Sequence, residues 1–338
     1  MADVIEVSYT GDLLAHRRCA RAWAYGKQAG FYPYEQVQAM EGRLVHHAME
    51  WLTRQYVEVH QRKRHATPTE LEEQLLRYFR VLWARGIRTS FESKEDVLKR
   101  VKNNLFPSSR MNAVVKVAIE GAMHTEYELR SVRKLMGTLP GMKEKLLLTG
   151  ILDLVVQQKS PLTYERLWSW TDRASLEGKV NVAKLPASPG DVEIWDYKAT
   201  RASTTLVADY VRQLLTYAYL YRERTGTRPS RCVLFFINEP DPSEKLLAVE
   251  LSDDLLVDAC QWTLEQVKVL QQTITNFQKD PRAVRGGEPG TKNAAITQEL
   301  QKQCTACGLR FDCNEYRTSL KLRGNTHPDI DIYNTGKN

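Results

Sequence analysis

The stretch "GILDLVV", residues 150–156, has the composition of a buried β-strand but carries a carboxylate, Asp153, at its centre. Strands rich in Ile, Leu and Val are buried on one or both faces. Burying an isolated ionised carboxylate is costly unless the group is paired or binds a metal ion. Asp153 therefore predicts a charged partner elsewhere in the chain.

The best candidate partner lies in "DVEIWDYKAT", residues 191–200. Side chains alternate along a strand, so Asp196 and Lys198 share one face. Aspartates on two neighbouring strands could hold Mg²⁺ or Mn²⁺, with the ammonium group beside the ion. Such a site could activate water and stabilise the charge that develops on a phosphate during phosphodiester hydrolysis. The alternative is an exposed Asp–Lys pair, because such pairs are common.

The rest of the chain alternates between helical and strand-like periodicity. Strand-like patterns occupy residues 144–158, 231–240 and 245–251, and strong helical patterns occupy 204–226 and 253–277. Upstream, helical spacing runs through 11–30, with Thr10 as a candidate N-cap, and through 36–62, 69–86 and 110–136. We therefore expect the first third to be mainly helical.

Asp153 and Asp196 are 43 positions apart, more than a simple hairpin requires. Residues 159–190, with mixed Pro, Ser, Gly and Trp, are interpreted as an insertion that accounts for the excess. An inert loop is the simpler interpretation. The alternative is that "LWSW" and the following "TDR" supply aromatic and cationic groups that stack on bases or bind a partner. The polar tail, 317–338, is expected to be flexible.

Composition limits the class of protein only loosely. The 338 residues carry a formal charge of +7, which weakly favours an anionic partner. No segment has the apolar length of a membrane span, and the first residues lack the pattern of a signal peptide. We therefore expect a cytoplasmic protein that does not enter a membrane.

Three of the six cysteines are crowded into "CTACGLRFDC", which places Cys304, Cys307 and Cys313 in a Cys-x2-Cys-x5-Cys pattern. Disulfides are not expected in a reducing cytoplasm. Zinc and cubane iron–sulfur sites both take four ligands, and Cys19 is the candidate for the fourth. Spacing alone leaves zinc and iron–sulfur open. Two further cysteines, at 232 and 260, are expected to be ordinary buried thiols.

Several short motifs occur together in one order along the chain: "GRLVH" with His46, "GILD" with Asp153, "DYK" with Asp196 and Lys198, and "QLLTY" with Gln213 and Tyr217. In this order they resemble the RecB-like branch of the PD-(D/E)XK nuclease superfamily, from about residue 8 to 316. The resemblance implies an α/β restriction-endonuclease-like core, a central mixed sheet flanked by helices, with a helical N-terminal arm.

The resemblance also implies roles for individual residues. It assigns metal binding to His46, Asp153 and Asp196, assistance of the attacking water to Lys198, and positions near the active site and the DNA to Gln213 and Tyr217. His47 is adjacent to His46, but the spacing from Gly42 favours His46.

The segment around Cys19, "SYTGDLLAHRRCARAW", is similar to that of RecB-like nucleases that hold a 4Fe-4S cluster, including AddB-type subunits and CRISPR-adaptation exonucleases. This resemblance implies that Cys19, Cys304, Cys307 and Cys313 bind 4Fe-4S rather than zinc. A structural role is expected, because cluster binding at both ends of the chain would stabilise the folded state. The basic residues Arg17, Arg18, Arg21 and Lys27 on the same predicted helix either contact phosphates or form a solvated face.

We therefore expect one RecB-like nuclease domain over residues 1–316. Its predicted parts are the helical arm at about 30–140, the nuclease core at about 141–280 and cluster-binding ends at about 8–27 and 300–316. The expected activity is a Mg²⁺- or Mn²⁺-dependent exonuclease on single-stranded or end-accessible DNA, in repair, recombination or defence. A non-catalytic DNA-binding or complex-forming subunit and a restriction-type endonuclease are the alternatives. No phosphate-binding helicase loop is visible, so any unwinding would come from a helicase partner.

Overall fold

The computed structural model of the protein describes residues 4–30, 39–59, 64–87, 93–130, 145–202 and 206–284, together with positions 286, 304, 307, 309 and 313. The chain divides into two compact units. The first, here the core unit, comprises Met1–Glu6 and Gln36–Thr263, and the second, here the terminal unit, comprises Val7–Glu35 and Leu264–Asn338.

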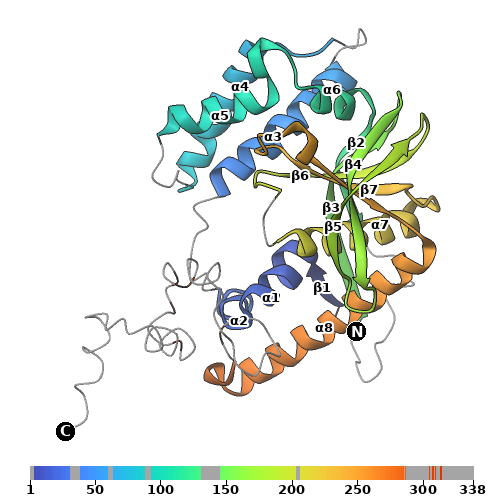
Figure 1. Ribbon diagram of the computed structural model, residues 1–338. Coiled ribbons are helices and arrows are strands. Elements are labelled where there is room, and N and C mark those ends of the chain that lie inside the picture. The colour runs from blue at the N-terminus through green and yellow to red at the C-terminus, as the bar shows by residue number, and fades with distance from the viewer. Residues whose placement is uncertain are drawn as a thin grey trace, which may run out of the picture. The chain divides into compact units, whose positions relative to one another are not determined.

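An eight-stranded mixed sheet is the centre of the core unit (Figure 1). Its strands lie in the order β1-β3-β6-β7-β8-β4-β5, and β2 pairs with β3. They are β1 (Val4–Ser8), β2 (Ala122–Arg130), β3 (Lys145–Gln157), β4 (Leu162–Asp172), β5 (Glu177–Ala187), β6 (Val192–Lys198), β7 (Arg231–Phe236) and β8 (Leu246–Glu250). Strand β6 runs parallel to β7 and β4 parallel to β8, whereas β3 and β6 are antiparallel. The predicted α/β class with a mixed sheet is confirmed.

A helical arm covers one face of this sheet (Figure 1). It consists of α3 (Ala39–Arg54), η2 (Gln55–Val59), α4 (Pro68–Ala84), α5 (Lys94–Leu105), η3 (Pro107–Ser109) and α6 (Ala113–Glu120). Helix α4 begins with a capping box between Thr67 and Glu70 and with Pro68 at its first position. The core beneath the arm contains Leu44, Leu71, Phe79, Val101 and Ile119 from the helices and Leu154, Trp195, Tyr197, Val233 and Phe235 from the strands.

Helix α7 (Val207–Thr225) covers the opposite face and makes the crossover that joins the parallel strands β6 and β7. Cys232 of β7 contacts the carbonyl oxygen of Leu214 in α7 at 3.6 Å, whereas its neighbour Val233 packs under the helical arm. Since side chains alternate along a strand, α7 and the arm lie on different faces of the sheet. Helix α7 ends at Gly226, which adopts the left-handed conformation with φ 75°.

The insertion at 159–190 was expected to be an inert loop, and the prediction of a loop is wrong. It forms the hairpin of β4 and β5, and β4 joins the sheet beside β8. Buried Arg212 of α7 donates to Glu177 on β5 and to Asp209, and its guanidinium lies 5.4 Å from the ring centre of Trp262. The "LWSW" motif contributes Trp168, which is buried. Residues of the hairpin are thus packed against the rest of the core unit.

The expected helix over 110–136 is correct only in its first part. Helix α6 ends at Glu120, and residues 122–130, "AMHTEYELR", form strand β2. Ala, Met, Glu, Leu and Arg favour helices, but pairing with the edge of β3 overrides a weak local propensity. The remaining residues of that prediction, 131–136, lie outside the described part of the chain.

The terminal unit begins with three short helices, η1 (Tyr9–Leu14), α1 (Ala15–Arg18) and α2 (Ala20–Ala29). The predicted single helix over 11–30 is therefore wrong, because Cys19 interrupts it with extended backbone at φ −160° and ψ 102°. Thr10 is not an N-cap but lies inside η1, which Ser8 precedes. Cys19 therefore lies between α1 and α2 and belongs to neither helix.

The N-terminal helices pack against helix α8 in this unit. Helix α8 (Asp253–Lys279) runs into it and is followed by η5 (Pro281–Ala283). The ring of His16 makes a 2.8 Å hydrogen bond to the hydroxyl of Thr273, and Tyr25 meets Phe277 edge to face at 4.9 Å. A buried carboxylate, Asp12, accepts hydrogen bonds from the Ser8 backbone and the Trp23 indole. The predicted flexible tail, 317–338, lies outside the described residues.

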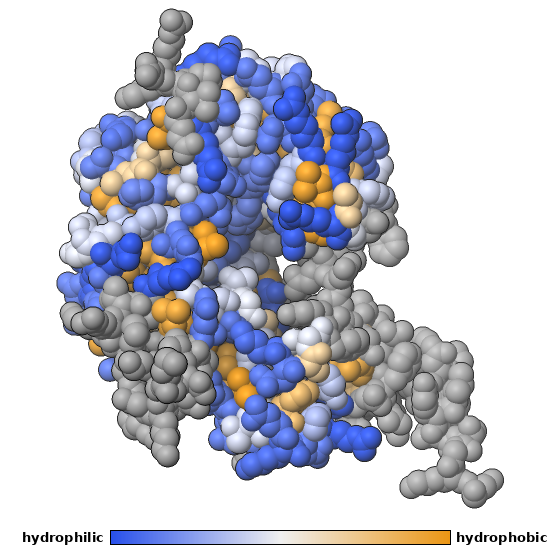
Figure 2. Space-filling model, turned by 180° about the vertical axis from the view of Figure 1, so that it is seen from behind, coloured by the Kyte–Doolittle hydropathy of each residue, from blue (hydrophilic) through white to orange (hydrophobic). Residues whose placement is uncertain are grey.

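On the face drawn in Figure 2 the described residues are mostly hydrophilic, and hydrophobic side chains form only small patches. None of the helices in the described ranges is both long and apolar enough to cross a membrane.

Candidate metal centre

Two aspartates meet where strands β3 and β6 separate. Their antiparallel pairing ends at Leu154↔Trp195, and one step further the same register places Asp153 opposite Asp196. The Asp153 carboxylate accepts a 2.9 Å hydrogen bond from the backbone N–H of Tyr197. Asp153 is 9% exposed and Asp196 3% exposed. The predicted pair of carboxylates therefore forms at a buried fork in the sheet.

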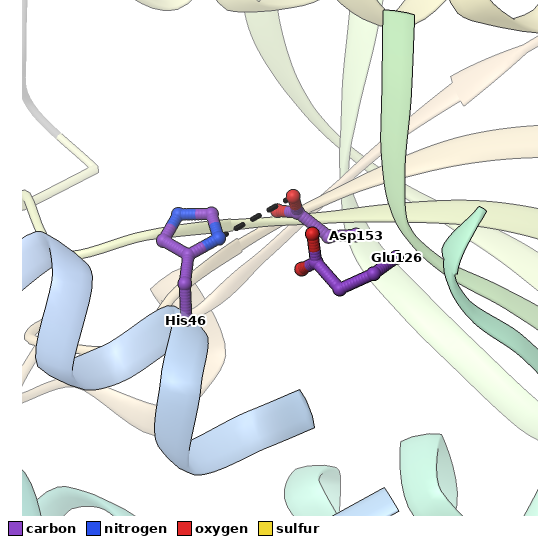
Figure 3. Close-up of side chains that lie close together, drawn as sticks. All are labelled: His46, Glu126 and Asp153. Carbon is purple, nitrogen blue, oxygen red and sulfur yellow. Dashed lines mark ion pairs between the residues drawn. The ribbon is translucent and has the colours of Figure 1, made fainter. Parts of the chain in front are cut away.

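A third carboxylate, Glu126, reaches the same place from β2. Its neighbours pair as Thr125↔Leu154 and Tyr127↔Leu152, so Glu126 lies opposite Asp153 across the β2–β3 ladder. Glu126 has φ 49°, a left-handed conformation that is uncommon outside glycine. Strained residues of this kind concentrate at functional sites. Glu126 thus combines this unusual backbone with a carboxylate that points toward Asp153 (Figure 3).

His46 completes this group from helix α3. Its Nδ1 lies 3.3 Å from Oδ1 of Asp153. One ligand atom each from His46, Glu126 and Asp153 lie within 4.8 Å of one another, and Figure 3 shows the three side chains converging. The adjacent His47 points elsewhere: it stacks on Tyr78 at 3.8 Å and makes a 2.9 Å hydrogen bond to Gln74. The geometry agrees with the choice of His46 over His47.

Lys198 is held on the α7 side of the same fork. Its Nζ lies 2.6 Å from Oδ2 of Asp196 and donates a 3.1 Å hydrogen bond to Oε1 of Gln213. The ammonium also lies 4.3 Å from the ring centre of Tyr210. The amide nitrogen of Gln213 donates in turn to the hydroxyl of Tyr217 at 3.2 Å. Gln213 and Tyr217 thus lie beside Lys198 and not in solvent.

The glycine of "GILD" explains how Tyr217 fits. A Cβ built on Gly150 would lie 2.5 Å from Cε1 of Tyr217, closer than real Cβ contacts. The absence of a side chain on β3 therefore lets the Tyr217 ring lie directly against the strand. A series of contacts thus runs from Gly150 through Tyr217 and Gln213 to Lys198.

The close charges shift the pKa values of the site. Burial opposes ionisation of Asp153, but His46 and Lys198 outweigh it and hold the pKa of Asp153 below its usual value. Burial, together with the nearby Asp153 charge, raises the pKa of Asp196 to about 6 although Lys198 opposes the shift. Burial likewise raises the pKa of Glu126 to about 7, and Asp153 adds to the effect. Like charges confined in one site resist simultaneous ionisation.

The nearby carboxylates raise the pKa values of the two basic groups, His46 and Lys198. Burial disfavours the charged form of His46, but Asp153 outweighs it and raises the pKa of His46 to about 9. Burial also disfavours the charged form of Lys198, yet Asp196 and Asp153 raise its pKa. Metal ligation requires a deprotonated imidazole and ionised carboxylates, and in that state the three carboxylates and Lys198 together carry two negative charges. A divalent cation would neutralise them, and carboxylate and imidazole ligands suit Mg²⁺ or Mn²⁺.

The four cysteines of the predicted cluster lie in the terminal unit. Burial and then the neighbouring thiols of Cys19, Cys313 and Cys307 raise the pKa of Cys304 to about 12. Cys304 is therefore close enough to the other three thiols to interact with them electrostatically. Within the described ranges the four thiols do not form a group as close as that of His46, Glu126 and Asp153.

The basic residues around Cys19 do not form one solvated face. Arg21 is buried, with its guanidinium 5.9 Å from the ring centre of Tyr25. Lys27 is paired with Asp12 at 3.0 Å. At least these two cations take part in the packing of the terminal unit.

Two residues at the site were missed by reasoning from the sequence, Glu126 and Tyr210. Glu126 fell within a predicted helix, and only the alternation of Thr125, Tyr127 and Leu129 gave a sign of a strand. Tyr210 lies three positions before Gln213, within the same helical stripe, so the helical periodicity of α7 could have identified it.

The class that this fold and these side chains define is a metal-dependent phosphodiester hydrolase. The chain belongs to the PD-(D/E)XK nuclease superfamily, whose family model matches residues 11–314. Membership of this superfamily implies a divalent metal ion as cofactor and DNA as substrate. A search of curated proteins finds no match to the chain.

Proposed function

We propose that this protein is a RecB-like, Mg²⁺- or Mn²⁺-dependent exonuclease that acts on single-stranded or end-accessible DNA. The observation that carries the proposal is the arrangement of Asp153, Asp196 and Lys198 at the fork between β3 and β6. His46 approaches this fork from α3, in agreement with the RecB-like motif order. The preference for DNA ends comes from the resemblance and not from the geometry.

In this proposal Asp153, Asp196 and His46 hold the metal ion, and Glu126 supplies a further donor. A bound Mg²⁺ or Mn²⁺ would activate water and neutralise charge on the phosphate. The backbone N–H of Tyr197 orients Asp153, since it donates to one of its carboxylate oxygens. The other oxygen is the one that faces His46.

Lys198 acts as a cation in the proposed reaction. Its pKa is raised by Asp196 and Asp153, so it remains protonated at neutral pH and does not serve as a general base. Asp196, Gln213 and the Tyr210 ring together fix the position of the ammonium. A fixed ammonium stabilises the negative charge that develops on phosphate oxygens in the transition state.

The proposal is tested by cleavage of single-stranded DNA labelled at either end, with Mg²⁺, with Mn²⁺ and with a chelator. Metal-dependent release of short products from one end, with closed circular single strands left intact, is the expected result. Cleavage of the circular strands would identify an endonuclease instead. Binding without cleavage in either metal would identify a non-catalytic subunit. Addition of a helicase tests whether duplex DNA becomes a substrate once it is unwound.

We further propose that Cys19, Cys304, Cys307 and Cys313 bind a 4Fe-4S cluster that stabilises the terminal unit. The proximity of Cys304 to the other three thiols supports a shared ligand, and the sequence around Cys19 favours iron–sulfur over zinc. Protein purified without oxygen should be brown and contain about four iron atoms per chain. Cys19→Ala should lose the colour and stability, whereas Cys260→Ala, a half-buried cysteine on α8, should keep both. A colourless protein with one zinc ion would contradict the iron–sulfur assignment.

A further inference from the structure

A small surface cavity adjoins the candidate metal centre on its β2 side. It has a volume of about 210 Å³ and is lined by Thr53, Arg54 and Val57 from the end of α3 and from η2, and by residues 122–127 of β2. Glu126 belongs both to this lining and to the group with His46 and Asp153. A molecule in the cavity would therefore lie next to the metal centre.

The lining combines apolar, aromatic and cationic groups. Val57 is 52% exposed and Met123 41% exposed, which is high for large apolar side chains. The rings of His124 and Tyr127 stack at 4.7 Å with an interplanar angle of 22°. Single-stranded nucleic acids bind to surfaces that combine aromatic rings with cations. The composition of the cavity matches this requirement.

Arg54 supplies the cation. Its side chain is 49% exposed, and its guanidinium is paired with Glu50 on the same helix at 2.8 Å. An exposed ion pair of this kind contributes little to stability, so a phosphate can replace Glu50 at low cost. The negative charges of the metal centre repel a DNA backbone, and a cation beside them reduces that repulsion.

The size of the cavity limits its occupant. Pockets for drug-sized ligands enclose about 300–1,000 Å³. A cavity of about 210 Å³ is below this range, so it has room for no more than one nucleotide. Strand β2 forms one wall of the cavity and also places Glu126 opposite Asp153. The register of β2 therefore sets the distance between the cavity and the metal centre.

We propose that this cavity binds one nucleotide of single-stranded DNA directly adjacent to the scissile phosphate. The base contacts Val57, Met123 and the His124 ring, and Arg54 contacts the phosphate. The inference rests on the proposed function, since it takes the group of Asp153, Asp196 and Lys198 as the place of cleavage. It adds a positioning role for Arg54 and His124 in the selection of unpaired strands.

The first test uses Arg54→Gln with Arg64→Gln as a matched control. Arg64 is also a surface arginine paired with a glutamate, Glu70, and is 53% exposed. With a fluorescein-labelled single strand and a chelator present, Arg54→Gln should raise Kd about fivefold to tenfold and reduce the slope of log K against log salt by about 0.7. Arg64→Gln should change neither. In cleavage assays Arg54→Gln should raise KM and leave kcat within about twofold.

The second test removes a stacking surface. His124→Ala should raise Kd for the single strand by about tenfold, since one stacking contact is lost. Photo-crosslinking of wild-type protein to strands that carry 5-iododeoxyuridine should modify residues within 122–127, and this readout requires no variant to fold. Crosslinks confined to other segments, or Arg54→Gln behaving like Arg64→Gln, would overturn the cavity assignment.

These outcomes separate the two proposals. If wild-type protein binds and crosslinks through β2 but cleaves no DNA with either metal, the nuclease assignment fails and the nucleotide site stands. If the protein cleaves DNA while Arg54→Gln and His124→Ala bind and cleave like wild type, the nucleotide site fails alone. If wild-type protein neither binds nor cleaves DNA, both fail.

Discussion

Strand β6 carries a buried carboxylate on each face, and the two are used differently. On the face under the helical arm, Glu193 is completely buried and accepts hydrogen bonds from Gln158 and Tyr164 at 2.6 Å and from Trp195 at 2.8 Å. Arg231 lies 3.3 Å from its second oxygen. On the α7 face, Asp196 shares one ammonium with a second aspartate, Asp153.

The comparison shows that burial of a charge does not by itself mark a functional site. Three donors bind one oxygen of Glu193 and the Arg231 guanidinium lies beside the other, so the charge is compensated within the protein, and Tyr164 joins the β4 hairpin to β6. Asp196 lies among other carboxylates, and its pKa is raised to about 6 because burial and Asp153 disfavour its charge. The cluster around Asp196 differs from that around Glu193 because its carboxylates outnumber its cations, and a bound cation can neutralise the excess.

We expect the largest effect from substitution of Asp196, and the matching substitution of Glu193 is its control. Asp196→Asn should reduce cleavage at least about a thousandfold, since the residues act as a unit. It should not destabilise the metal-free fold, because burial and Asp153 together disfavour the charge of Asp196 more than Lys198 favours it. Glu193→Gln should instead cost about 1–3 kcal/mol of unfolding free energy, with the folded enzyme still active. Urea denaturation and single-turnover cleavage measure the two effects. Near-normal cleavage by Asp196→Asn would show that the metal centre is misassigned.

The second effect is the dependence of stability on pH and metal. A raised pKa of about 9 for His46 stabilises the fold fully below pH 6.5, and this contribution is lost as pH rises through about 9. The raised pKa of Asp196 acts in the same sense, with loss as pH rises through about 6. Chelator-treated protein should therefore lose stability with rising pH.

Divalent metal should reverse this trend, because its ligands must be deprotonated. The increase in Tm on addition of Mg²⁺ or Mn²⁺ should grow from about pH 6 to pH 9, as measured by thermal unfolding. Asp153→Asn should abolish the increase, and Glu193→Gln should keep it. A metal effect that shrinks with rising pH would contradict the proposed ligands.

A third, smaller effect concerns the glycine that admits Tyr217. Gly150→Ala places a methyl group 2.5 Å from the Tyr217 ring and should cost about 1–3 kcal/mol. Gly150→Ala should also lower kcat about tenfold, because the displaced Tyr217 ring shifts Gln213 and Lys198. Adding Tyr217→Leu to the same protein should partly restore kcat, because the smaller side chain leaves room for the methyl group. Gly42→Ala is the matched control: nothing lies within 4 Å of its added Cβ on α3, so it should stabilise the protein by about 0.5–1 kcal/mol. Equal effects of the two substitutions would refute the packing argument.

The smallest expected effect is that of the aromatic ring below Lys198. Tyr210→Leu should lower cleavage about threefold to tenfold, because a cation–π contact is worth about 0.5–2 kcal/mol. Tyr210→Phe keeps the ring and should cleave like wild type. A large loss with Tyr210→Phe would mean that the hydroxyl and not the ring is required.

Several elements of the site were predictable from local pattern. Apolar residues recur with strand-like spacing in β3 and β6 and with helical spacing in α7, and the charged residues stand out among them. The shared face of Asp196 and Lys198 follows from the alternation of a single strand. Asp196 and Lys198 lie near Gln213 because only a short segment joins the end of β6 at Lys198 to the start of α7 at Val207.

Other features depended on contacts between distant segments. Glu126 is part of the site because β2 pairs with β3 in a register that sets it opposite Asp153, although residues 122–130 have local helical propensity. The insertion forms a hairpin packed on the core unit, because Tyr164 donates to buried Glu193 on β6 and buried Arg212 of α7 pairs with Glu177 on β5. The backbone break at Cys19 lies inside a segment with continuous helical periodicity.

Local pattern was enough to predict which strands carry the two aspartates and the lysine, which helix carries the glutamine and tyrosine, and which histidine and cysteines are candidate ligands. The third carboxylate, the glycine contact with Tyr217 and the difference between the two charged clusters on β6 became visible only in the folded chain. Periodicity and composition act within one segment. Strand register, burial and pKa shifts arise only when segments far apart in the chain pack together.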